Sequence, residues 1–159
     1  MSYSFRPFTA EDLPMVRAWI ATPDAARWWD DGEGDDFEEG LLDPHTQQWI
    51  VSIDGRPFAY AQDYDPHAWP GHPFADLPPG SRGVDQTIGV PELLNRGHGS
   101  AFVRQHVERL FAEGAPAVGT DPHPDNARAI RAYEKAGFVR GAVQNTDWGL
   151  ALLMRRYKE

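Results

Sequence analysis

The chain has 159 residues, and its 15 Lys and Arg against 24 Asp and Glu give a net charge of −9 with neutral His. This length predicts a single domain, residues 1–159, with its own hydrophobic core. The absence of Cys excludes disulfides, a Cys zinc site and a thiol nucleophile. The acidic balance argues against nucleic-acid binding and favours a cationic partner, because phosphate binding depends on Lys and Arg.

No apolar run approaches the ~20 residues of a membrane span, and the N-terminal residues lack the pattern of a signal peptide. We therefore expect a cytoplasmic protein that does not bind membranes. The sequence leaves the oligomeric state open.

The N-terminal part of the chain predicts one strand and one helix. Residues 3–8 predict a short strand, and Thr9 predicts the cap of the helix that follows. The apolar residues of this helix have the spacing of one helical face: Leu13, Val16 and Ile20. Residues 22–45 predict an irregular segment.

A hairpin is predicted next. Strands at 49–53 and 57–64 flank the turn pair Asp54-Gly55. Residues 65–81 contain five prolines and predict a loop, in which we expect Trp69 and Phe74 to be exposed.

The C-terminal half predicts strands that alternate with two helices. A strand at 82–90 precedes a glycine turn at 95–99, which begins a helix that ends at Gly114. One face of that helix carries Val103, Val107, Leu110 and Phe111. The remaining elements are a strand at 117–120, a helix from Asp125 or Asn126 to Ala136, and two strands within 138–157. This order predicts an α/β fold with a mixed central sheet flanked by helices.

The segment Asn95-Arg96-Gly97-His98-Gly99-Ser100 lies between a predicted strand and a predicted helix. Glycines there let backbone N–H groups approach a phosphate, and the helix N-terminus adds partial positive charge. The segment lacks the third glycine of a dinucleotide fingerprint and the Lys of a P-loop. Alone, it fits an ordinary glycine turn as well as an anion site.

A second segment runs from Asn126 to Phe138. Asn126 is placed to cap the helix, and Tyr133, seven residues on, lies on nearly the same face. On spacing alone, Asn126 can be only a cap and Tyr133 only a packing residue.

Together, the two segments resemble the GCN5-related N-acetyltransferase (GNAT) superfamily. There, an Arg/Gln-x-x-Gly-x-Gly/Ala turn binds the pyrophosphate of acetyl-CoA, and an Asn-x-x-Ala-x-x-x-Tyr-x-x-x-Gly-Phe segment completes the cofactor site. Residues 94–99 and 126–138 match these motifs, except that Leu94 replaces the Arg or Gln. Residues 60–64, 82–86 and 120–122, with the pair Trp28-Trp29, resemble the aminoglycoside 6′-N-acetyltransferases of type Ib.

The resemblance implies the GNAT fold, acetyl-CoA as the acetyl donor and transfer to the 6′-amine of an aminoglycoside. Contacts with the cofactor are expected at Gln86, Thr87, Ile88, Asn95, Arg96, Gly97, His98, Gly99, Ser100, Asn126 and Tyr133. Contacts with the substrate are expected at Trp28, Trp29, Gln62, Tyr64, Asp85 and Asp121.

Eight carboxylates lie between Asp30 and Asp43, and no Lys or Arg lies between Arg27 and Arg56. Such a run is commonly a solvated face, but it also raises the local concentration of a polycation. Trp28 and Trp29 precede it. They fit core packing or, alternatively, apolar and cation–π contacts with an aminated sugar.

Asp85 and Asp121 each interrupt or end a predicted strand. A charged residue in such a position needs a partner, which a salt bridge to Arg82 or a turn cap would supply. The functional alternative makes Asp85 the general base and both carboxylates anchors for ammonium groups. Tyr133 is then the acid that protonates the CoA thiolate, and a backbone N–H near Gln86 or Thr87 polarises the acetyl carbonyl. Without Cys, attack is expected to be direct.

Two alternatives stay open. In the first, the same acetyl transfer acts on a siderophore-type hydroxylamine or a peptide amine. In the second, the protein is a CoA-binding or drug-binding module without catalysis. The spacing of the six His predicts no metal site, and the Ser residues lack the context of a hydrolase nucleophile.

Overall fold

The computed structural model describes residues 3–29 and 36–159, apart from the side chain of Asp36. The strands are β1 (Ser4–Pro7), β2 (Thr46–Ile53), β3 (Arg56–Tyr64), β4 (Arg82–Ile88), β5 (Ala117–Thr120), β6 (Val139–Thr146) and β7 (Gly149–Tyr157). The α-helices are α1 (Leu13–Ile20), α2 (Pro23–Ala26), α3 (Asp36–Leu42), α4 (His98–Ala112) and α5 (Ala127–Lys135). Short 3-10 turns lie at Ala10–Asp12, Pro66–Ala68 and Pro91–Leu93.

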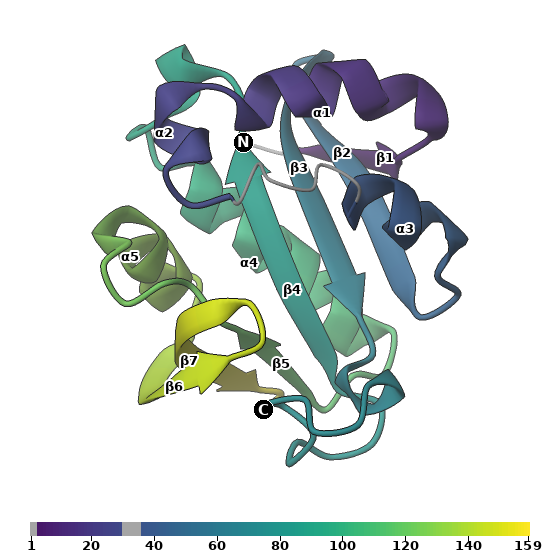
Figure 1. Ribbon diagram of the computed structural model, residues 1–159, viewed down its shortest axis with the longest axis vertical. Helices are drawn as coiled ribbons and strands as arrows, with labels where there is room; N and C mark the ends of the chain where they lie inside the picture. The colour runs from purple at the N-terminus through teal and green to yellow at the C-terminus, as the bar shows by residue number, and fades with distance from the viewer. Residues whose placement is uncertain (1–2, 30–35) are drawn as a thin grey trace.

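The strands form one mixed sheet in the order β1-β2-β3-β4-β5-β7-β6 (Figure 1). All neighbours are antiparallel except β4 and β5, which are parallel. A parallel pair needs a crossover connection, and α4 provides it between these two strands. The prediction of an α/β fold with a mixed sheet flanked by helices is therefore confirmed.

The contact between β4 and β5 positions the site. Their ladder comprises only two residue pairs, Arg82 with Val118 and Gly83 with Gly119. On its other edge, β4 pairs with β3 as far as Ile88. Within the part of the chain that the structure describes, no strand pairs with the free edge of β4 at residues 86–88. Backbone groups on that edge are available to a ligand.

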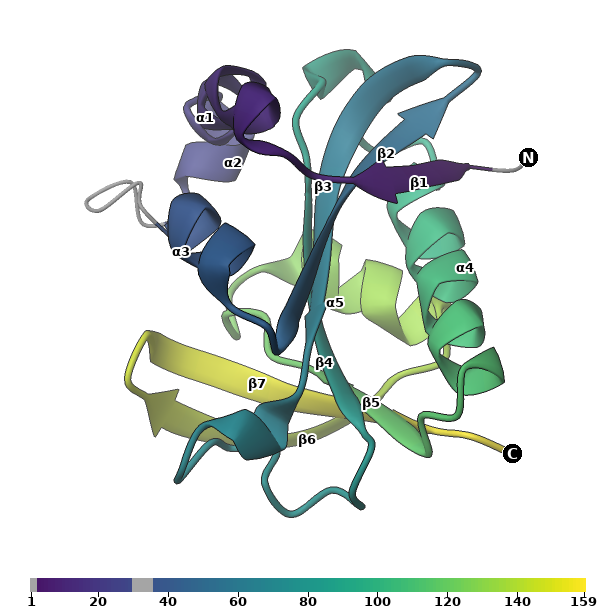
Figure 2. The same cartoon turned by 90° about the vertical axis from the view of Figure 1, so that its right-hand side faces the viewer.

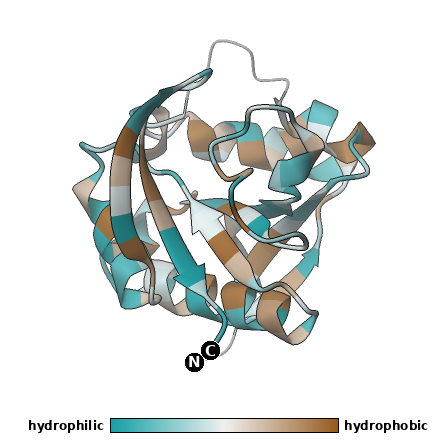
Figure 3. Cartoon of the chain, turned by 90° about the horizontal axis from the view of Figure 1, so that it is seen from below, coloured by the Kyte–Doolittle hydropathy of each residue, from teal (hydrophilic) through white to brown (hydrophobic). Residues whose placement is uncertain are grey.

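Helices cover both faces of the sheet (Figure 2). On one face, α1 and α3 pack with β2 and β3 around Val16, Trp19, Phe37 and Tyr60. On the other face, α4 and α5 enclose the larger core. Figure 3 shows hydrophobic segments on the helices and on the central strands, and because helices cover both faces, β5 is buried at all of its positions. No helix among the described residues is long and apolar enough to cross a membrane.

The expectation of an irregular segment at 22–45 is wrong for two parts, which form α2 and α3. Phe37 explains α3, because its side chain is buried against Phe8, Trp29 and Tyr60. Phe37 lies among carboxylates, and the other apolar residues of the helix, Leu41 and Leu42, are exposed, so the apolar signal of this helix is weak. Tertiary packing therefore decides its structure.

The loop at 65–81 is correctly predicted as largely irregular, but Phe74 is wrongly expected to be exposed. Its side chain is fully buried with Leu77, Ala117 and Leu153. A Cβ on Gly119 would come within 2.8 Å of the Phe74 ring, so this glycine makes room for it. Trp69 is 39% exposed, as expected.

Candidate active site

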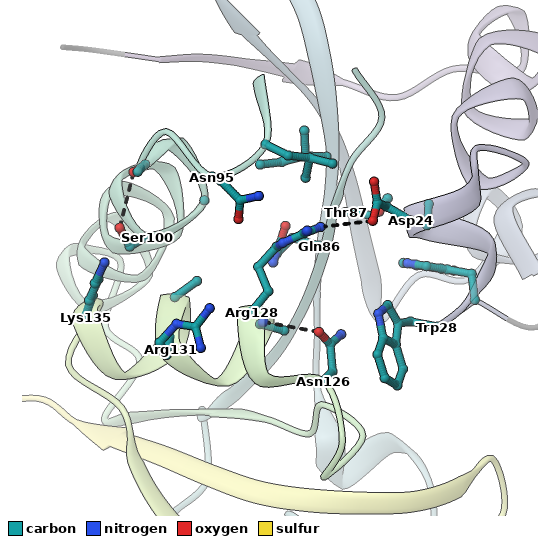
Figure 4. Close-up of a pocket in the computed structure, with 18 residues that line it drawn as sticks. Asp24, Trp28, Gln86, Thr87, Asn95, Ser100, Asn126, Arg128, Arg131 and Lys135 are labelled. Atoms are coloured by element: carbon teal, nitrogen blue, oxygen red, sulfur yellow. Dashed lines mark hydrogen bonds and ion pairs between the residues drawn. The ribbon is translucent and has the colours of Figure 1, made fainter. Parts of the chain in front are cut away.

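A cavity of about 270 Å³ opens between the free edge of β4, the start of α4, helix α5 and helix α2 (Figure 4). It brings together ten of the sequence-predicted site residues: Trp28, Trp29, Gln86, Thr87, Ile88, Asn95, Gly97, Gly99, Ser100 and Asn126. Arg96, His98 and Tyr133, together with Gln62, Tyr64, Asp85 and Asp121, are not part of its lining.

The glycine turn is built from left-handed backbone at two positions. Asn95 has φ +59° and Gly97 has φ +83°. Nothing lies within 4 Å of a Cβ built on Gly97, so glycine is favoured there by backbone conformation and not by lack of space. The turn ends at α4, where the first backbone hydrogen bond runs from Ala101 N–H to the Gly97 carbonyl.

The N–H groups of His98, Gly99 and Ser100 precede that first bond and are available to an anion. The His98 side chain is engaged elsewhere. Its Nδ1 is 2.9 Å from the Tyr3 hydroxyl, and its ring packs edge-on against Phe58. Only the backbone of His98 can therefore serve a ligand in the cavity.

Asn126 caps α5, because its Oδ1 accepts a hydrogen bond from Ala129 N–H at 3.3 Å. The capping interpretation is therefore correct. The side chain also lines the cavity, and its Nδ2 has no protein partner among the described residues, so capping and ligand binding are compatible.

Three basic residues of the cavity were missed by the sequence analysis: Arg128, Arg131 and Lys135. They follow the i, i+3, i+7 spacing of one helical face, which is the signal that could have found them. Arg128 Nη1 lies 3.5 Å from Asp24 Oδ1, so this ion pair joins α5 to α2 across the cavity (Figure 4). The basic face complements the positive end of α4.

A pair of carboxyl groups lies next to the cavity. Asp85 follows Val84 on β4 and Asp121 follows Thr120 of β5, and their side chains are hydrogen-bonded to each other. Burial raises the pKa of Asp85, and burial together with the charge of Asp85 raises the pKa of Asp121 well above its ordinary value. Two adjacent acids cannot both ionise freely, so they share a proton.

The suggested salt bridge between Asp85 and Arg82 does not form. Arg82 Nη2 lies 2.6 Å from Asp63 Oδ1, and His106 and Trp49 also hydrogen-bond to Asp63 at 2.9 Å each. This buried network leaves Asp85 without a cationic partner among the described residues.

Asp85 is held instead by a chain of neutral side chains. Gln62 Nε2 donates to Asp85 Oδ2 at 2.8 Å, and the Tyr60 hydroxyl donates to Gln62 Oε1 at 2.9 Å. Gln48 Nε2 in turn donates to the Tyr60 oxygen at 2.9 Å. These contacts orient the carboxylate without neutralising it.

Tyr133 is buried on α5 beneath the cavity, with the polar side chains of Thr120 and Gln86 beside its hydroxyl. Burial, with the nearby charge of Asp85, raises the pKa of Tyr133, so the phenol stays protonated at neutral pH. Gln86 Oε1 is buried and lacks a hydrogen-bond partner among the described residues. Such an acceptor calls for a donor, which a water molecule or a ligand would supply.

The remaining predicted substrate residues are Tyr64, which lies near the carboxyl pair, and the two tryptophans, which line the cavity. Tyr64 is buried against Gly83, where a Cβ would come within 2.2 Å of its ring. Burial and the charges of Asp121 and Asp85 raise its pKa. Trp29 stacks on Phe37, with ring centroids 5.5 Å apart, and Trp28 packs near His123 at 5.6 Å. Both tryptophans therefore combine packing with cavity lining.

The acidic run lies only partly within the described residues. Asp30, Asp31, Glu33 and Asp35, and the side chain of Asp36, fall outside them. Glu38 pairs with Arg17 at 2.6 Å, and Asp43 accepts from His45 N–H and Thr46 Oγ1. These two residues have structural roles. Within the described ranges, no group of three or more His, Cys, Asp or Glu is placed to hold a metal ion.

The free strand edge, the helix N-terminus and the basic helix face together form a cavity that suits an anionic ligand with amide groups. The acetyltransferase (GNAT) domain model matches residues 9–146, and the chain belongs to this family. It is therefore an acetyltransferase that uses acetyl-CoA as the acetyl donor.

Within this family, the chain is similar to individual aminoglycoside acetyltransferases. It is 35% identical to the aminoglycoside N(6′)-acetyltransferase type 1 of Klebsiella pneumoniae, over 96% of this chain and 82% of that protein. Among solved structures, it matches AAC(6′)-Ib in complex with paromomycin and acetyl-CoA, with a TM-score of 0.89, 33% identity and coverage of 99% of this chain and 94% of that one. AAC(6′)-Ib in complex with coenzyme A and kanamycin also matches, with a TM-score of 0.89, 34% identity and coverage of 99% and 95%.

Proposed function

We propose that the protein transfers an acetyl group from acetyl-CoA to the 6′-amine of an aminoglycoside by direct attack. The observation that carries the proposal is the carboxyl pair Asp85–Asp121, which adjoins the cofactor cavity and has no cationic partner among the described residues. A polyamine supplies the missing positive charge. The names of the relatives support the same substrate class.

The cofactor is held at both ends of the cavity. The pyrophosphate sits against the N–H groups of residues 98–100, where the helix dipole adds positive potential. Arg128, Arg131 and Lys135 attract the remaining phosphate charge. The Asn126 Nδ2 group bonds an amide of the pantetheine arm, and the Gln86 side chain lines the same part of the cavity.

The amine reaches the site as an ammonium, because alkylamines titrate near ~10. Asp121 and Asp85 attract it and replace its lost hydration. Asp85 then accepts a proton from the ammonium, and its raised pKa brings the carboxylate closer to the range in which a general base works well. The free amine attacks the thioester carbonyl.

The new N–C bond forms before the C–S bond breaks. A backbone N–H at the free edge of β4, near Gln86 or Thr87, stabilises the negative oxygen of the tetrahedral intermediate. Tyr133 protonates the departing thiolate, the nitrogen of the new amide gives its second proton to the resulting phenolate, and the proton on Asp85 passes to solvent. Burial raises the pKa of the phenol, so Tyr133 enters this step protonated. No Cys is present to carry the acetyl group.

The test is thiol release from acetyl-CoA by the purified protein, across aminoglycosides with a 6′-amine and matched compounds with a 6′-hydroxyl. Hydroxylated lysine and a lysine peptide are included as other acceptors. We expect turnover with the 6′-amines alone. Turnover only with the hydroxylamine or the peptide would overturn the substrate assignment, and acetyl-CoA binding without any thiol release would overturn the catalytic role.

A further inference from the structure

Trp148 lies at the tip of the β6–β7 hairpin, which reaches the same side of the molecule as α1–α3 (Figure 2). Its side chain is 59% exposed, yet it is held in place. The indole Nε1–H donates to Asp121 Oδ2 at 3.0 Å, so the ring stands next to the carboxyl pair. Neither the motifs nor the mechanism above uses this residue.

The hairpin turn fixes the position of the indole. Gly149 has φ +112°, a conformation that favours glycine. The Thr146 hydroxyl donates to the Gly149 carbonyl at 2.6 Å and accepts from Trp148 N–H at 3.3 Å. An exposed tryptophan on a turn closed in this way is a preorganised contact surface and not a loose side chain.

Aromatic rings support one side of the indole. The His72 ring centroid lies 5.5 Å from that of Trp148, and the Tyr64 centroid lies 5.4 Å from that of His72. His72 Nδ1 accepts a hydrogen bond from Phe74 N–H at 3.0 Å. Burial and the nearby His67 lower the pKa of His72, so it is neutral at pH 7 and does not repel a cation. The Pro-rich loop therefore contributes a neutral support for Trp148.

We propose that Trp148 is a substrate-recognition residue, whose exposed indole face stacks on the sugar ring that bears the ammonium held by Asp121 and Asp85. An aminated sugar offers an apolar C–H face and a cation, and an indole face attracts both. The inference rests on the proposed function and identifies the aminated sugar ring as the part of the substrate that Trp148 contacts.

The indole also positions Asp121 through its N–H group. Two substitutions separate these roles. Trp148→Phe keeps an aromatic face but removes the N–H donor, whereas Trp148→Ala removes both. Leu150→Ala is the matched control, because Leu150 is a 51% exposed apolar residue on the same hairpin and has no role in the mechanism.

The experiment measures kcat and KM for kanamycin and for acetyl-CoA, with melting temperatures for all variants. For Trp148→Ala we expect the KM for kanamycin to rise roughly tenfold, as the loss of one cation–π and stacking contact predicts. Its KM for acetyl-CoA should stay within about twofold of the wild-type value by the same argument. Trp148→Phe should show a smaller rise, and Leu150→Ala should match the wild type.

Wild-type kinetics in Trp148→Ala would overturn the inference while leaving the proposed function intact. An equal rise of both KM values, or the same defect in Leu150→Ala, would also overturn it, since that result indicates a general effect on the hairpin. If the wild-type protein acetylates no aminoglycoside, the proposed function itself fails, and the two failures are thereby distinguished.

Discussion

The carboxyl group of Asp85 on β4 is hydrogen-bonded to that of Asp121, which follows β5. The parallel pairing of Arg82 with Val118 and Gly83 with Gly119 sets the register that brings them together. Because the ladder stops there, β4 continues into the cofactor cavity with a free edge. One local feature of the sheet thus creates both the acidic pair and the space for the acetyl donor.

The base assignment predicts a large kinetic effect of Asp85→Asn. The variant keeps the shape and the contact with Gln62 but removes the proton acceptor. We expect kcat/KM for an aminoglycoside to fall by about 10²–10⁴-fold. Asp54→Asn is the control, because Asp54 is exposed on a hairpin turn with φ +49°, which Asn tolerates. Near-normal turnover by Asp85→Asn would reject its role as the base.

The raised pKa of Asp85 predicts the pH dependence of the reaction. Burial favours the protonated acid, so the carboxylate that accepts the proton forms at a higher pH than an ordinary Asp would require. The acid limb of the kcat/KM profile should therefore have an apparent pKa above ~4, the usual value of an Asp carboxyl group, and closer to neutral pH. A pH profile from 4 to 9 measures it. If the acid limb has the apparent pKa of an ordinary carboxyl group, the buried Asp85 is not the base.

Tyr133→Phe tests the acid that protonates the thiolate. Because the phenol acts only on the departing thiolate, we expect kcat to fall with little change in KM for acetyl-CoA. Tyr157→Phe, at an exposed position near the C-terminus, is the matched control. A kcat that equals the wild-type value across the pH range would remove Tyr133 from the mechanism.

The acidic run predicts salt-dependent substrate capture. A variant that neutralises Glu33, Asp35 and Glu39 should raise KM for a polycationic aminoglycoside at low salt, and the difference should shrink as salt screens the charges. Neutralising Asp54, Glu108 and Glu159 changes the net charge equally elsewhere. If the KM values of the two variants change in the same way over 10–500 mM salt, the acidic run is only a solvated face.

Asp63 is predicted to stabilise the fold without taking part in the chemistry. Burial raises its pKa, but the hydrogen bonds from His106, Trp49 and Arg82 outweigh this and lower the pKa below its ordinary value. Its contribution to stability is therefore present above the unfolded pKa and is lost as the pH falls through the lowered one. Asp63→Asn should cost about 3–5 kcal/mol at pH 7, because Arg82 loses its buried partner.

Urea unfolding at pH 7 and pH 4 measures that effect, with Asp54→Asn as the control. The loss should be smaller at pH 4, where the unfolded carboxyl is partly protonated. A loss of less than about 1 kcal/mol at pH 7 would mean that the network contributes no more than a surface ion pair.

Much of the fold and of the candidate cofactor site follows from local sequence signals. The glycine turn at 95–99 and the Asn126 cap are short-range features, and α4 begins where the turn predicts. Helix α3 could not be predicted in this way, because its buried residue, Phe37, packs against aromatic residues that lie far away in the sequence. The burial of Phe74 likewise depends on Gly119, which lies far along the chain.

The substrate side of the site was less accessible to sequence reasoning. Asp85 and Asp121 were recognised as unusual, but their pairing depends on a parallel register that no local pattern encodes. Trp148 gave no signal, since its role follows from a hairpin tip that reaches Asp121. The basic face of α5 is encoded as helical spacing, but that it lines the cavity depends on how α5 packs against the rest of the fold.

The most direct test of the central claim is to identify the acetylated atom. Kanamycin is incubated with acetyl-CoA and the wild-type protein, and the product is analysed by mass spectrometry and two-dimensional NMR. We predict a single added acetyl group on the 6′-nitrogen. A product acetylated at another amine, or unmodified kanamycin in the presence of bound acetyl-CoA, would contradict this account of the site.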